Sequence, residues 1–168
     1  MTLEDLGNLG ELIAAIATLG ALIYLAMQIR QNSESVKLSA GQTILTSLNE
    51  ALQSASSSPQ QARVVILGQS DFDNLPEEEQ IQFIVWLFGW FRVLEQAHHY
   101  NKKGILDKEI WGGHVNHTKQ VMKGATAISW WSKRKSFFSS SFQEFIDDMV
   151  SSESEAPSPR ELMESMRK

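Results

Sequence analysis

The sequence contains no cysteine, which excludes disulfide scaffolds, thiolate zinc sites, iron–sulfur clusters and cysteine nucleophiles. It also lacks a Walker loop, a dinucleotide-binding fingerprint, a Gly-x-Ser-x-Gly elbow and a His-Glu-x-x-His helix. Among its 168 residues, 15 lysines and arginines face 20 aspartates and glutamates, a formal net charge of −5. That balance is not typical of a dedicated nucleic-acid binder, so we expect neither a nucleic-acid partner nor a cofactor.

Charged residues are absent from Leu12 to Ile29, and this apolar run spans about 27 Å as a helix, close to the hydrocarbon thickness of a bilayer. The run has an acidic rather than a basic start and no small-residue cleavage site, so we expect a retained anchor rather than a signal peptide. Basic residues flank only its C-terminal end, at Arg30 and Lys37. The positive-inside rule then predicts that the N-terminus lies outside and that residues 30 onward lie in the cytoplasm. The alternative is the buried core helix of a soluble domain.

Small residues recur along one face of the expected anchor in unbroken heptad spacing. This face, called the Gly/Ala seam below, consists of Gly7, Gly10, Ala14, Ala17, Ala21, Tyr24 and Gln28. Small side chains let transmembrane helices approach closely, so the seam favours contact with a second copy or with another membrane protein. Chance is the plain alternative, since some face must be the smallest. A homo-oligomeric pore lined by Thr18, Tyr24 and Gln28 is a further alternative, which the small, apolar seam disfavours.

The rest of the chain shows helical spacing and no strand-type alternation, so the predicted fold class is all-α. We expect an anchor at 1–31, a compact helical cytoplasmic domain at 32–150 and a polar acidic tail at 151–168. The anchor either continues into a long second helix or ends where a new helix starts near Ser33. Further helices are expected at 59–68, 76–103, 107–123, 127–135 and 141–150. The apolar segment Ile81–Phe91 suits a central core helix, or else a helix partly immersed in the membrane interface.

Two tryptophans, Trp130 and Trp131, precede the cations Lys133, Arg134 and Lys135. Indole rings favour the membrane–water boundary and cations favour an anionic leaflet, so this segment is a candidate contact with membrane lipid. The alternative is a short amphipathic helix with tryptophans in the core and solvated cations outside.

Histidines supply the strongest candidate for catalysis. Glu95, His98 and His99 share a face of one expected helix, and His114 and His117 share a face of the next. Such a set suits a mononuclear zinc or iron site, although a carboxylate-bridged di-iron bundle needs two Glu-x-x-His units and only one is present. The favoured interpretation is that Glu95 pairs with a lysine or arginine and that no metal is bound. A second candidate, the acidic segment 71–74, begins like a calcium loop but lacks its glycine and its final glutamate.

Three stretches carry a resemblance to a known family: 23–32, Glu95 with 104–111, and 130–147. Across roughly residues 9 to 147 the chain resembles a family of short, uncharacterised bacterial proteins with one N-terminal span and a compact helical body. The resemblance implies bacterial origin, this topology and a non-enzymatic role, and it transfers no catalytic residue. The predicted function is therefore structural: self-association, or packing as an accessory subunit in a larger membrane complex. A pore and a metal-dependent membrane enzyme are the alternatives.

Overall fold

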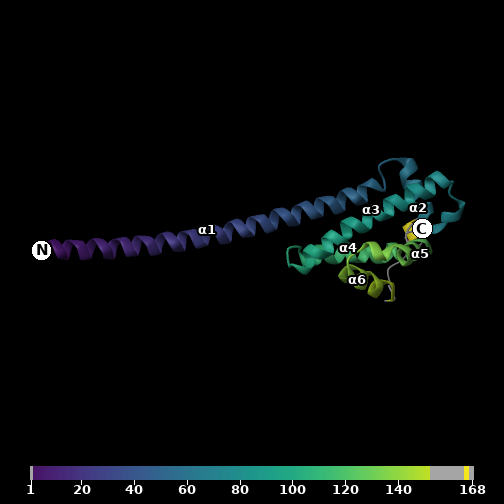
Figure 1. Cartoon of the computed structure of the whole chain (residues 1–168). Helices are drawn as coiled ribbons and strands as arrows, with labels where there is room; N and C mark the ends of the chain where they lie inside the picture. The colour runs from purple at the N-terminus through teal and green to yellow at the C-terminus, as the bar shows by residue number, and fades with distance from the viewer. Residues whose placement is uncertain (1, 152–164, 167–168) are drawn as a thin grey trace. The chain divides into compact units, whose positions relative to one another are not determined.

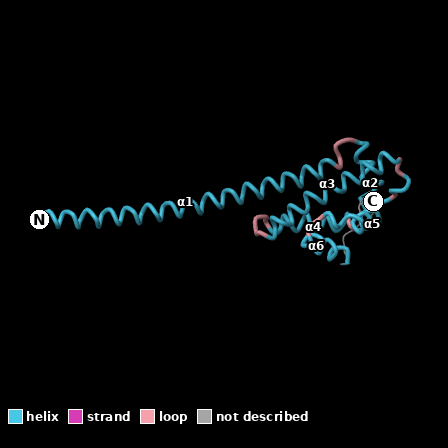
Figure 2. Tube along the Cα trace, viewed as in Figure 1, coloured by secondary structure: helices cyan, strands magenta, loops and turns pink. Residues whose placement is uncertain are grey.

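The computed structural model describes residues 2–151 and 165–166. Over these residues the chain forms helices joined by turns and contains no strand (Figure 2), which confirms the all-α prediction. The chain divides into two compact units, residues 1–40 and residues 41–168. The second unit therefore starts at Gly41. The sequence pattern instead predicted a domain boundary between residues 31 and 32.

Helix α1 extends without interruption over Leu3–Ser54. No helix restarts at Ser33, because no glycine or proline lies between Arg30 and Gly41. Within the first unit this helix is long and apolar enough to cross a membrane. Its most apolar window has a mean hydropathy of 2.1, and none of that window is buried.

In the described part of the second unit, the end of α1 is followed by five α-helices and two single-turn helices. Figure 1 labels the helices α2 to α6. Their bounds are α2 Pro59–Ser70, η1 Phe72–Asn74, α3 Glu77–Lys102, α4 Lys108–Val121, α5 Ala125–Arg134, η2 Lys135–Phe137 and α6 Ser140–Ser151. Helices α2 and α6 pack against α3, and α2 also packs against α5.

Local chemistry explains where several of these helices begin and end. The Ser58 hydroxyl accepts a hydrogen bond from the backbone N–H of Gln61 at 3.0 Å and so caps α2. The Asp107 carboxylate accepts from the N–H groups of Glu109 and Ile110 at the start of α4. After α3 the chain turns at Gly104, whose φ of 67° suits glycine. The sequence predicted all three features.

Helix α3 supplies the centre of the core. Phe83, Leu87 and Phe91 are fully buried, while Ile81 and Val85 in the same apolar segment are exposed. The core-helix interpretation of this segment is therefore correct for the face that packs inward. Ile44 and Leu48 of α1 belong to the same hydrophobic cluster.

The predicted polar tail, 151–168, lies almost wholly outside the described residues. Ser151 is the last residue of α6, and residues 165–166 form part of a helical turn.

Candidate functional site

The Gly/Ala seam lies on α1 inside the first unit. A Cβ added at Gly7 or Gly10 would have no neighbouring atom within 4 Å, so a second helix has room to approach there. The polar groups near the seam are satisfied within the helix. Thr18 donates to the carbonyl of Ala14 at 2.8 Å, and the Gln28 amide donates to the Tyr24 hydroxyl at 2.9 Å.

The structure corrects the prediction that Trp130 and Trp131 lie at a membrane surface. Their exposed fractions are 7% and 3%, and both rings stack on Phe91, with centroids 5.2 and 5.3 Å away. The Trp131 indole N–H also donates to the Asp147 carboxylate at 2.8 Å. Both indoles are therefore core groups, because the amphipathic face of α5 is covered by α3 and α6 rather than by lipid.

The three cations that follow have different surroundings. Lys135 forms an ion pair with Asp147 at 2.8 Å, and the Arg134 guanidinium lies over the Phe137 ring, 5.7 Å from its centroid. Lys133 has no hydrogen-bond or ion-pair partner among the described residues. Lys133 and Arg134 are exposed, so these two remain available to a ligand or a surface.

Glu95 has a structural role in the turn before α6. Its carboxylate accepts from the backbone N–H of Ser139 at 2.7 Å and from Arg92 at 2.9 Å. Burial alone would raise the pKa of Glu95, but these hydrogen bonds outweigh burial and hold the pKa below its usual value. The carboxylate is engaged, as the ion-pair interpretation of the sequence predicted.

The histidines are not assembled into a metal site. His98 stacks on Phe145 with centroids 4.4 Å apart, and its Nε2 lies 3.1 Å from the Ser141 hydroxyl. His117 packs edge-on against Trp90 at 5.4 Å. Within residues 2–151 and 165–166, no three His, Asp or Glu side chains converge as metal ligands. His99 and His114 do not complete a set of three ligands either, so the residues that the sequence proposed for metal binding do not form a metal site.

Burial lowers the pKa of three of these imidazoles, those of His98, His114 and His117. Desolvation disfavours the charged form, and for His98 the neighbouring Lys102 ammonium adds repulsion. His98 is buried, whereas His114 and His117 are half-buried.

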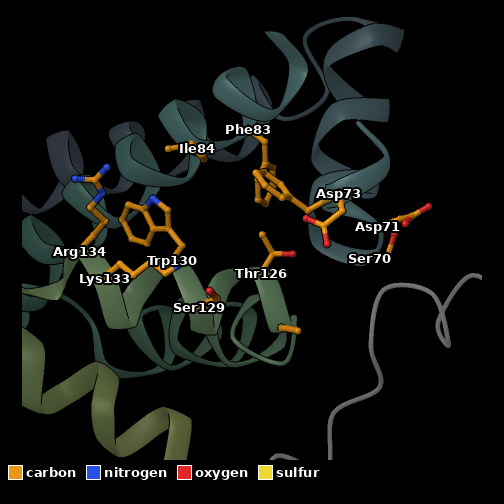
Figure 3. Close-up of a pocket in the computed structure, with 12 residues that line it drawn as sticks. Ser70, Asp71, Asp73, Phe83, Ile84, Thr126, Ser129, Trp130, Lys133 and Arg134 are labelled. Atoms are coloured by element: carbon orange, nitrogen blue, oxygen red, sulfur yellow. The ribbon is translucent and has the colours of Figure 1, made fainter. Parts of the chain in front are cut away.

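A cavity of about 530 Å³ lies in the second unit, between the end of α2, η1, α3 and α5. Figure 3 shows Phe83 and Ile84 on one side of it and Thr126 and Ser129 on the opposite side. Trp130 forms part of the wall, so the buried indole borders this cavity. Its volume falls within the range of small-molecule sites.

Opposite charges stand at the two ends of this cavity. Figure 3 places Lys133 and Arg134 at one end, with Asp71 and Asp73 at the other. Asp71 accepts from the Asn74 side-chain amide at 2.8 Å, whereas Asp73 has no partner among the described residues. Sequence reasoning missed this site, because the two aspartates are far from the two cations along the chain. The sequence signalled the two ends separately, as the acidic segment 71–74 and as Trp130 with the cations Lys133 and Arg134.

No family model, curated protein or solved structure matches this chain. The features of the chain that bear on function are therefore the apolar helix α1 and the charged cavity of the second unit.

Proposed function

We propose that this protein is a single-span membrane protein that acts as a structural or assembly component, by self-association or as an accessory subunit of a larger membrane complex. The observation that carries the proposal is the uncovered apolar surface of α1. Ten large apolar side chains between Leu12 and Ile29 are each more than half exposed. Leaving them in water forfeits on the order of 10 kcal/mol of burial free energy, comparable to the whole stability of a typical domain. Lipid is the natural cover for such a surface.

The Gly/Ala seam is the proposed contact between helices. In lipid the hydrophobic effect no longer drives helices together, so close backbone approach provides much of the attraction. The open space around Gly7 and Gly10 is consistent with such an approach. We place the anchor in a bacterial inner membrane, as the sequence resemblance implies, with residues 30 onward in the cytoplasm because basic residues flank only this end of the run.

The assembly is tested by size. Purified full-length protein in mild detergent is compared with the Ala14→Leu/Ala17→Leu variant, whose leucines enlarge the seam. The matched control is Ala15→Leu/Ala26→Leu, which adds the same side chains on the opposite face of α1. We expect the seam variant to run as a smaller species by native mass spectrometry and the control to keep its mass. Equal masses for all three proteins would refute the seam as the contact.

Location and orientation are tested with the same chain. The protein should sediment with membranes and resist extraction by alkaline carbonate; release into the soluble fraction would refute the anchor. Because the chain has no cysteine, Leu3→Cys and Ser57→Cys each introduce a single labelling site. A membrane-impermeant maleimide applied to intact spheroplasts should label the first and spare the second, and the reverse pattern would overturn the orientation.

A further inference from the structure

The cavity between α2, α3 and α5 combines three chemistries that match different parts of one ligand. Phe72, Phe83, Ile84 and Trp130 provide an apolar lining. Lys133 and Arg134 provide donors for an anion at one end, and the carboxylate of Asp73 provides acceptors at the other, where Asp71 points away from the cavity (Figure 3). A purely anionic or purely apolar ligand would leave one of these features unmatched.

The unpartnered charges point to a zwitterion. Phosphate oxygens accept charge-assisted hydrogen bonds from lysine and arginine, and a primary ammonium donates such bonds to carboxylates. Both Lys133 and Asp73 have exposed charged groups without a partner among the described residues. The hydroxyls of Thr126 and Ser129 lie between the two ends and suit an ester or phosphate oxygen.

We infer that this cavity binds a zwitterionic phospholipid with a primary ammonium, of the phosphatidylethanolamine class. Its phosphate would lie at Lys133 and Arg134, its ammonium at Asp73, and its hydrocarbon, which is joined through the phosphate, against Trp130 at the cation end. The inference rests on the proposed membrane attachment, because the chain from Arg30 to Gly41 extends at most about 40 Å and so keeps the second unit close to a bilayer.

The same charges discriminate among phospholipids. Phosphatidylglycerol has the phosphate but no cation, so it leaves Asp73 unpaired. Phosphatidylcholine has a quaternary ammonium without N–H donors, so it offers the carboxylates no hydrogen bond. We expect the site to prefer the ethanolamine head group over both.

Binding is measured on the full-length protein in mild detergent, by native mass spectrometry of lipid adducts. The probes are the dihexanoyl forms of phosphatidylethanolamine, phosphatidylcholine and phosphatidylglycerol, with O-phosphoethanolamine as the free head group. We expect the ethanolamine lipid to bind most tightly and the free head group to bind at least about tenfold more weakly, because it lacks the apolar contact. Equal binding of lipid and free head group would overturn the assignment to a lipid.

Two variants assign the ends of the ligand. Lys133→Gln should weaken both the ethanolamine and the glycerol lipid by about tenfold, the loss of a charge-assisted hydrogen bond. Asp73→Asn should weaken only the ethanolamine lipid and so abolish its preference over the glycerol lipid. Lys123→Gln and Asp148→Asn are the matched controls, because both residues are exposed and neither borders the cavity. Controls that lose binding as strongly as the variants would refute the site.

A third variant tests the cavity itself. Ser129 is exposed on the cavity wall, so Ser129→Phe should fill the space without disturbing the core, and all three lipids should lose their adducts. Unchanged adducts would overturn the inference. Failure of the proposed function shows up separately, as release of the protein into the soluble fraction. Such a soluble protein can still be tested for binding of these short-chain lipids. A membrane-bound protein without ethanolamine preference refutes the lipid site alone.

Discussion

Gly68→Ala tests the packing that positions the cavity. Gly68 is buried in α2 where this helix crosses α3. A Cβ at this position would meet three atoms of the Phe83 ring, the farthest of them at 2.7 Å. Real Cβ contacts are essentially never closer than 3.0 Å, so either the ring or the helix must move. Phe83 lines the cavity, and the two aspartates follow directly after α2, so the close approach at Gly68 holds this side of the site.

The expected cost follows from how little the ring can yield. Phe83 is fully buried, with the Phe72 ring centroid at 6.0 Å and that of Trp86 at 5.9 Å. Overpacking a core in this way costs about 3 kcal/mol, near the upper end of the usual range. Alanine recovers about 1 kcal/mol of helix propensity relative to glycine. We therefore expect a net destabilisation of about 2 kcal/mol.

The matched control is Gly89→Ala in the middle of α3, where an added Cβ would have nothing within 4 Å. This variant should gain about 1 kcal/mol from propensity alone. Urea unfolding of the full-length protein in mild detergent measures both, followed by tryptophan fluorescence. All five tryptophans belong to the second unit, so the signal reports that unit specifically.

A Gly68→Ala variant as stable as Gly89→Ala would refute the steric argument. The double variant Gly68→Ala/Phe83→Leu gives a further check, because the smaller leucine should relieve part of the clash. The two substitutions should then be less destabilising together than their separate effects predict. Strict additivity would show that Gly68 and Phe83 do not act on each other.

Three further predictions follow from contacts in the second unit. Burial lowers the pKa values of His98, His114 and His117, so the unfolded chain takes up protons at a higher pH than the folded chain does. The free energy of unfolding should therefore be constant above about pH 6.5 and fall as the pH drops below it. A urea midpoint that rises on acidification would contradict this expectation. Asp147→Ala should destabilise the unit by about 1–3 kcal/mol in urea unfolding because it leaves the buried Trp131 indole N–H without its acceptor, and an unchanged midpoint would show that this bond contributes nothing. Ser58→Ala should cost about 1 kcal/mol by the same assay through loss of the α2 cap, an effect that vanishes if solvent satisfies the Gln61 N–H equally well.

The helices were predictable because their signals are local. Ser58 and Asp107 supply capping oxygens within three residues of the N–H groups they bind, and Gly104 adopts the positive φ that ends α3. The apolar run of α1 is likewise a property of consecutive residues. Its continuity as far as Ser54 was one of two alternatives, since the stretch after Arg30 carries both a capping serine and good helix formers.

The residues around Trp130 show where such reasoning stops. An indole next to cations has the same sequence pattern whether protein or lipid covers its apolar face, because amphipathicity specifies that a face is covered but not by what. Contacts with Phe91 and Asp147, from helices distant in sequence, decided in favour of the core. The histidines are similar, since helical spacing placed them in pairs and only packing against Phe145 and Trp90 separated the pairs.

The sequence by itself determined the helical character of this protein, the ends of most helices and the presence of one uncharged helical run long enough for a bilayer. Each of these depends on hydrogen bonds and side-chain chemistry within a few residues. Only the tertiary structure decided which aromatic rings are buried and which charges meet. The cavity between Asp73 and Lys133 exists because α5, which follows α3 only after α4, packs beside α2 and α3, and such long-range packing leaves no periodic signal in the sequence.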